Sequence, residues 1–200
     1  MAYTVPSHDP ATGTKIPPSW GDEVNANFLV LNSAEDHIFL HSYVGISDIT
    51  TPVTGQYRHV TASGIDPEID ILGFDDSSDE GIGYNYYLPA DYSSSPKLKI
   101  SYMMAESNTS KSVRFVAQVC ALSDGDYRRA AAFDSENAIT ISVPDAAHEE
   151  DSFEIELTND DNMVAESRLV IFIWRNADHV DDDAIGDFRV TGLKFCYERS

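Results

Sequence analysis

From Gly83 to the end of the chain, apolar residues recur at every second position in a series of short segments. Clear examples are residues 98–104, 113–119 and 153–157, where one phase is apolar and the other is largely polar. Successive side chains of a strand point to opposite faces, so a period of two predicts strands with one face in a core. The sequence therefore predicts a mainly β protein, an antiparallel β-sandwich of the jelly-roll kind, over residues 82–200.

Two departures from this alternation carry further information. Residues 169–174 are apolar in both phases, which predicts a central strand that is covered on both faces. In the last segment, 188–197, the apolar phase changes at Gly192. An extra residue in one strand would restore a common face, so the sequence predicts a β-bulge at this glycine.

The chain ahead of the sandwich divides into two predicted parts. Residues 1–45 are expected to form an extended arm and one short α-helix, which begins near Trp20 after two prolines that block helix upstream. Residues 46–81 are rich in Thr, Ser, Gly, Pro and Asp, which predicts a polar linker with short strands.

The predicted helix has one apolar stripe at helical spacing. Its members are Trp20, Val24, Phe28 and Leu31. A stripe this short cannot form a domain, so it must bury its apolar face against the sandwich or against another copy of the chain. We therefore predict that these four residues form an anchoring or oligomerisation interface.

The charge of the chain excludes some classes of partner. It has 34 acidic against 13 basic residues, a formal net charge of -21. Phosphates would meet a negative surface, which disfavours binding to nucleic acid or to an anionic membrane. Residues 1–10 lack the apolar region of a secretory signal, and no apolar run has the length of about 20 residues that spans a bilayer.

The acidic loops and the cysteines lack the spacing of a metal or redox site. Residues 75–81, 160–161 and 181–183 offer many oxygens without the order of an EF-hand. Solvated turns are the preferred interpretation and calcium is the alternative, so we predict no metal and no cofactor. Cys120 and Cys196 are expected to be buried free thiols.

Catalytic patterns are also missing. Glu154 and Glu156 could be a glycosidase pair, but they form the polar phase of an amphipathic strand, which favours a solvated face. No nucleophile elbow, phosphate loop or dinucleotide fingerprint occurs. The sequence predicts that the protein is not an enzyme and has no catalytic residues.

Tyrosines gather near the start of the sandwich. Tyr84, Tyr86 and Tyr87 lie close together, and Tyr92 follows. Aromatic rings of this kind stack on sugars or anchor protein interfaces. The other interpretation is a strand with one face in the core. These four residues are the candidate ligand face.

Two passages resemble parts of tailed-bacteriophage virion proteins. Residues 11–28 resemble the start of many such proteins, with a Thr/Pro-rich arm, a Trp-Gly pair and a Val-Asn pair. The second passage, similar to a β-sandwich module behind such starts, comprises residues 87–92, 98–102, 138–144 and 188–197. The resemblance implies no catalytic residues.

This resemblance implies a non-enzymatic virion component, and we predict a capsid decoration or cement protein. The chain would be a homotrimer, and the stripe would dock on the major capsid protein or on other virion proteins. Burial of an apolar side chain of this size contributes roughly 1.5–3 kcal/mol. The alternative is a tail fibre, or a receptor- or glycan-binding sandwich that uses the four tyrosines.

Overall fold

The structure is a computed structural model in which the sandwich belongs to one compact unit, Ser33–Ser200. It describes residues 71–126 and 132–200 in full, and the backbone of short strand segments between residues 33 and 70. The predicted helix and its stripe of Trp20, Val24, Phe28 and Leu31 lie outside the described residues, so both remain predictions.

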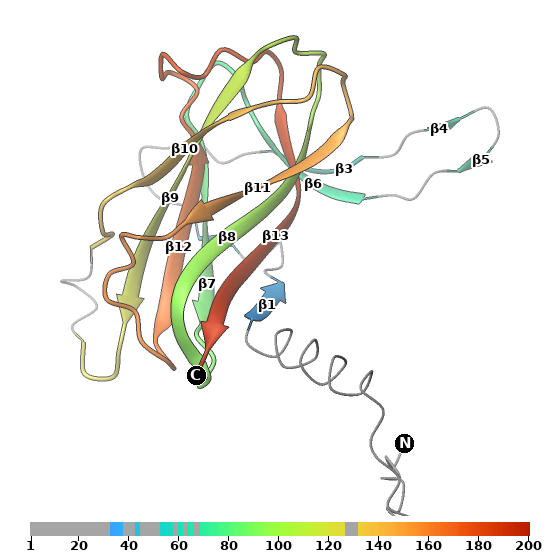
Figure 1. Ribbon diagram of the computed structural model, residues 1–200. Coiled ribbons are helices and arrows are strands. Elements are labelled where there is room, and N and C mark those ends of the chain that lie inside the picture. The colour runs from blue at the N-terminus through green and yellow to red at the C-terminus, as the bar shows by residue number, and fades with distance from the viewer. Residues whose placement is uncertain are drawn as a thin grey trace, which may run out of the picture. The chain divides into compact units, whose positions relative to one another are not determined.

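Two antiparallel sheets form the sandwich, and Figure 1 shows them as stacked layers. The six-stranded sheet contains, in order, β11 (Glu150–Glu156), β8 (Tyr92–Met104), β13 (Phe188–Arg199), β6 (Ile69–Phe74) and β3 (Val53–Tyr57), with β1 (Ser33–His37) also paired to β13. The five-stranded sheet contains β10 (Asn137–Ser142), β9 (Ser112–Leu122), β12 (Arg168–Arg175), β7 (Glu80–Tyr87) and β2 (Tyr43–Val44). A separate two-stranded ladder joins β4 (Val60–Thr61) and β5 (Gly64–Ile65). The predicted antiparallel β-sandwich is thus confirmed.

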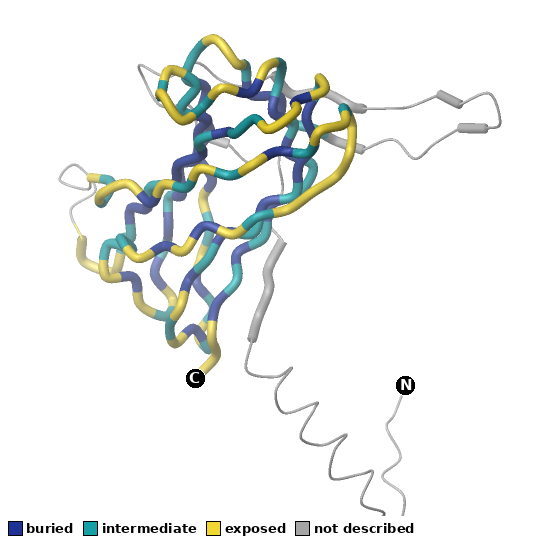
Figure 2. Tube along the Cα trace, turned by 45° about the horizontal axis from the view of Figure 1, so that its top comes forward, coloured by how far each residue is buried: buried dark blue, intermediate teal, exposed yellow. Residues whose placement is uncertain are grey.

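The main core fills the space between the two sheets. Figure 2 shows buried and exposed positions alternating along many of the strands, as the period of two requires. Aromatic rings meet at the centre, where Tyr102 stacks on Phe188 with ring centroids 4.4 Å apart and Phe115 lies 5.2 Å from Phe188. These contacts join β8 and β13 of one sheet to β9 of the other, so the core holds the two layers together.

The strand predicted to be central and covered on both faces is β12. It pairs with β7 on one side and β9 on the other. Ile171 and Ile173 point into the main core, whereas Phe172 and Trp174 lie on the opposite face in a second apolar cluster with Val116. Both faces of β12 are buried over residues 171–175, which confirms the prediction there, whereas Arg168 and Val170 on the outer face are half-buried.

The predicted β-bulge is present at Gly192. Along β13 the register with β8 shifts between Val190 and Gly192, so that Val190 pairs with Tyr102 and Leu193 pairs with Ile100. The extra residue brings Val190 and Leu193 to the same, core-facing side despite their odd spacing.

Strands from residues 33–81 contribute to both sheets. β1 pairs with β13, β2 with β7, and β3 with β6. The sequence predicts short strands within residues 46–81, where β3 lies, but it assigns β1 and β2 to the arm and does not predict that these strands join the two sheets. Short strands that pair through backbone hydrogen bonds need little apolar side-chain pattern, and they therefore leave little trace in the sequence.

The described residues contain no α-helix, and thus none with the length and apolarity needed to cross a membrane.

Candidate functional site

The outer face of the five-stranded sheet, the face turned away from the main core, carries a polar and aromatic patch at one end. There the register aligns β7, β12 and β9 side by side. The first row across the three strands is Tyr87, Arg168 and Leu122, and the second row is Asn85, Val170 and Cys120. Their strand neighbours Tyr86, Leu169 and Ala121 pack on the core side, so both rows face outward.

A hollow of about 690 Å³ lies over the first row. Tyr87, Leu122 and Arg168 form its floor. One wall is the turn 123–126 after β9, and the other is the loop 164–167 before β12. The site is therefore built from strand ends and from the two loops that adjoin them, where binding residues are common.

The wall 123–126 is a tight turn. The backbone N–H of Ser123 donates to the Asp126 carboxylate at 2.7 Å, and the N–H of Asp126 donates to the Ser123 carbonyl at 3.1 Å. Gly125 has a φ of 97°, a conformation that glycine adopts at little cost. These bonds present Asp124 and Asp126 at the rim of the hollow.

The wall 164–167 is fixed to the end of β7. The N–H of Leu88 donates to the Ser167 carbonyl at 2.9 Å, and the N–H of Glu166 donates to the Leu88 carbonyl at 3.1 Å. The Ser167 hydroxyl is 3.3 Å from that of Ser123, so the two walls are in contact. The loop 164–167 is thus fixed by hydrogen bonds to Leu88 and contacts the turn 123–126.

Apolar surface is concentrated at this hollow. Tyr87 is 65% exposed and Val164 is 55% exposed. They are two of the four large hydrophobic side chains that are exposed in the described part of the chain, the others being Val180 and Ile185. An exposed ring beside polar groups is typical of a binding surface, since burial of apolar area favours association.

Arg168 supplies hydrogen-bond donors to the floor. Its Nη2 donates to the Asn85 side-chain oxygen at 2.6 Å, which orients the guanidinium. Its Nε is buried and makes no hydrogen bond. A guanidinium has five N–H donors, so Arg168 retains donors that no described residue uses.

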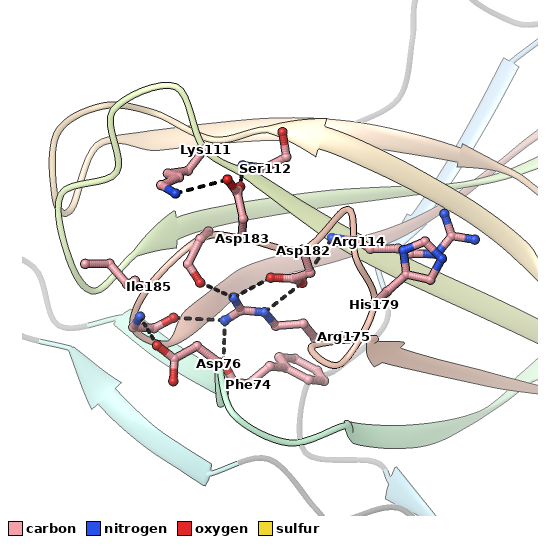
Figure 3. Close-up of polar contacts among 12 residues, drawn as sticks. Phe74, Asp76, Lys111, Ser112, Arg114, Arg175, His179, Asp182, Asp183 and Ile185 are labelled. Atoms are coloured by element: carbon pink, nitrogen blue, oxygen red, sulfur yellow. Dashed lines mark hydrogen bonds and ion pairs between the residues drawn. The ribbon is translucent and has the colours of Figure 1, made fainter.

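Arg175, at the other end of β12, differs in this respect. It is fully buried and pairs with Asp182, whose side chain is 2% exposed. Nε and Nη2 donate to the two Asp182 oxygens at 3.0 and 2.8 Å. The remaining donors reach the carbonyls of Phe74, Ala184 and Gly186. Figure 3 shows this closed network.

All five donors of Arg175 are therefore used within the protein. The network ties the end of β12 to the end of β6 in the other sheet, through Phe74, and to the loop 176–187. Its role is structural, whereas the floor around Arg168 can serve a ligand.

The four tyrosines predicted as a ligand face lie in different environments. Tyr84 and Tyr92 are buried, and burial raises the pKa of both hydroxyls, that of Tyr92 to about 12 with a contribution from Asp160. Tyr86 packs against Phe195 with centroids 5.1 Å apart. Tyr87 is exposed and lines the hollow. Alternation along β7 explains the difference, since residues 84 and 86 share the core face.

The acidic loops and the glutamate pair have structural partners. Among the described residues, no group of three or more His, Cys, Asp or Glu is placed to hold a metal ion. Asp182 is held by Arg175. Glu154 and Glu156 form exposed ion pairs with Lys97, at 3.7 and 3.3 Å. These pairs lie on a solvated strand face.

The cysteines form no disulfide, as expected. Cys120 is buried and Cys196 is half-buried. Burial raises the pKa of the Cys120 thiol, with smaller contributions from Asp161 and Asp126. A thiol with a raised pKa is a weaker nucleophile at neutral pH.

Sequence reasoning missed most of the hollow. Arg168 stands at the start of the apolar segment 169–174, where it looks like an ordinary strand boundary. Asn85 lies among the tyrosines, and the loops 123–126 and 164–167 are far apart in the chain. Only the strand register brings them together, and register has no sequence signature here.

No protein-family model matches the chain, and no curated protein matches it. Among solved structures, it is similar to a family 11 carbohydrate-binding module from Clostridium thermocellum in complex with a β-1,3-1,4-mixed-linked tetrasaccharide. The identity is 13% and the TM-score is 0.41, over 82% of this chain and 95% of that chain.

Two further solved structures are similar at 10% identity. One is a carbohydrate-binding module from Caldicellulosiruptor saccharolyticus in complex with mannohexaose, with a TM-score of 0.39 over 82% of this chain and 96% of that chain. The other is the enzymatically active domain of tailspike protein 4 of bacteriophage CBA120, with a TM-score of 0.37 over 84% of this chain and 19% of that chain. The two antiparallel sheets described above assign this chain to the β-sandwich class.

Proposed function

We propose that the sandwich is a glycan-binding module and that its ligand occupies the hollow over Tyr87 and Arg168. The observation that supports this most strongly is the combination on one floor of an exposed aromatic ring and a guanidinium with unused donors. Exposed carboxylates on both walls supply acceptors, and the exposed Ser123 hydroxyl supplies a further donor.

A sugar matches this arrangement chemically. Its ring has an apolar C–H face, which would stack on Tyr87, and a rim of hydroxyls. The hydroxyl oxygens would accept from Arg168, and the hydroxyl protons would be donated to Asp124 and Glu166. The proposed role is binding without turnover, as the sequence predicts.

The sequence prediction of a capsid decoration protein depends on the N-terminal stripe, which no described residue tests. The virion location, the homotrimer and the contact with the major capsid protein remain proposals. A glycan-binding sandwich is compatible with a virion protein, because it would place a receptor-binding surface behind an anchoring arm. This is the alternative function that the sequence analysis named.

The test is a glycan array with the full chain, followed by calorimetry on the ligands found. We expect binding to at least one class of glycan, and we expect Tyr87→Ala to weaken it tenfold or more with an unchanged melting temperature. Val180→Ala, which truncates an exposed apolar residue outside the hollow, is the matched control and should bind normally. An array without binding, or equal binding by both variants, contradicts the proposal.

A further inference from the structure

The charges of the residues that line the hollow indicate which glycans it can bind. Asp124 and Asp126 lie on one wall, Glu166 lies on the other, and Arg168 is the one cation among the described residues that line the hollow. Arg168 donates to the neutral amide of Asn85. Within the described residues, none of the three carboxylates belongs to an ion pair. The lining is therefore net negative.

We infer, on the basis of the proposed glycan-binding function, that the hollow takes uncharged glycans and rejects those with carboxylate or sulfate groups. An ionised carboxylate accepts hydrogen bonds and cannot donate them. The hydroxyls of a neutral sugar can donate to Asp124 and Glu166. A uronate or sulfate would instead bring its own negative acceptors toward them.

The guanidinium of Arg168 does not reverse this preference. Arg168 lies on the floor with its Nε buried and Nη2 held by Asn85, whereas the carboxylates lie on both walls above it. An anionic ligand would meet the walls as well as the floor. In a water-like dielectric, two uncompensated wall carboxylates that each lie about 6 Å from the negative charge of the ligand lower its affinity by about tenfold.

The charge of the whole chain acts in the same direction. The net charge of -21 produces a negative potential that slows the approach of anions at low salt. Arg128 and Arg129 follow the wall 123–126 in sequence and lie outside the described residues. The experiment therefore uses the full chain, in which both arginines are present.

The experiment compares matched pairs of ligands by calorimetry on the full chain. Each pair consists of a neutral tetrasaccharide of glucose, mannose or galactose and its C6-oxidised uronate counterpart, with the same linkage and length. For any pair that binds, we expect the affinity for the uronate to be at least tenfold lower than the affinity for the neutral tetrasaccharide at 20 mM salt. The difference should shrink at 500 mM salt, because exposed charges are screened.

Removal of the wall charges tests whether the carboxylates cause the preference for neutral glycans. Asp124→Asn combined with Glu166→Gln should raise the ratio of uronate affinity to neutral-glycan affinity by about tenfold at low salt, whatever its effect on neutral binding alone. The control is Glu149→Gln with Asp178→Asn, which removes the same charge from two exposed residues outside the hollow. This control should leave the neutral-to-uronate ratio nearly unchanged.

The outcomes separate the two proposals. Binding of a neutral tetrasaccharide with a weak uronate partner supports both. Equal or tighter binding of the uronate overturns the charge preference and leaves glycan binding intact. If the control double variant raises uronate binding as much as the wall variant, the selectivity does not come from the hollow. If no member of any pair binds and the array also shows no ligand, glycan binding itself is contradicted.

Discussion

Arg168 and Arg175 begin and end the same strand but have opposite roles. They are seven residues apart on β12, about 23 Å at the usual rise of a strand. Odd spacing places Arg175 on the core side and Arg168 on the outer face. Arg175 uses every donor inside the protein, whereas Arg168 makes one hydrogen bond within the described part of the chain, to Asn85. Burial and partners, rather than residue type, separate the structural arginine from the candidate binding residue.

Replacement of Arg175 by Met should lower the free energy of unfolding by about 3–5 kcal/mol, because it leaves the buried Asp182 carboxylate without its partner. Urea unfolding measures this change. Arg168→Met is the matched control and should change the free energy of unfolding by no more than about 0.5 kcal/mol, because half-buried Arg168 neutralises no buried carboxylate among the described residues. Equal effects of the two substitutions would show that the Arg175 network is not structural.

Glu80 is buried beside Asp75, and this makes the stability depend on pH. Burial, the largest cause, raises the pKa of the Glu80 carboxyl above its ordinary value of 4.5, and the nearby Asp75 and Asp187 add to the rise. The unfolded chain then ionises at lower pH than the folded chain. As pH rises through 4.5 toward the raised pKa, the folded state should lose stability relative to the unfolded state.

The substitution Glu80→Gln should therefore stabilise the protein at pH 7. Glutamine retains an oxygen that can accept from the Asp75 N–H, now at 2.8 Å from Glu80 Oε2. The gain over the unmodified chain should disappear below pH 4, where Glu80 is neutral in both states. Thermal unfolding from pH 3.5 to 7.5 measures it, and a gain that is constant over this range would contradict the account.

The pairing of β7 with β12 depends on a glycine. A Cβ on Gly81 would lie 2.4 Å from Phe172 Cζ and 2.9 Å from Trp174 Cβ. Gly81→Ala should therefore destabilise the protein by about 1–3 kcal/mol, as overpacked sites do. Gly192→Ala is the control, because its added Cβ would come no closer than 3.5 Å to Ser101. Chemical unfolding of both variants tests this, and an equal loss in both would contradict a specific clash at Gly81.

The strands with a strong side-chain pattern could be predicted from the sequence, and those without one could not. Residues 169–174 have no polar phase, which identified the central strand, and the change of phase located the bulge at Gly192. The short β1, β2 and β3 pair largely through their backbones, so their place in the two sheets was not foreseen. The hollow needs the register of three strands, and only Tyr87 of its residues was among the candidates.

The whole molecule combines the described sandwich with an N-terminal unit, Met1–Asn32. If the stripe on that unit holds copies of the chain together, Trp20→Ala with Phe28→Ala should convert the predicted homotrimer into monomers and leave the melting temperature of the sandwich within about 2 °C. Light scattering after gel filtration measures the mass. A chain that is already a monomer, or a double variant that stays trimeric, would contradict the anchoring prediction.

The most direct test of a ligand site at the Tyr87 end of the outer face is an NMR titration of the full chain with a glycan identified on the array. We expect the largest shift changes at the backbone amides of Asn85, Tyr87, Glu166 and Arg168. Arg175 and its neighbours in the loop 176–187 should change little. Shift changes centred on the Arg175 end of β12, or on the outer face of the six-stranded sheet, would contradict the account.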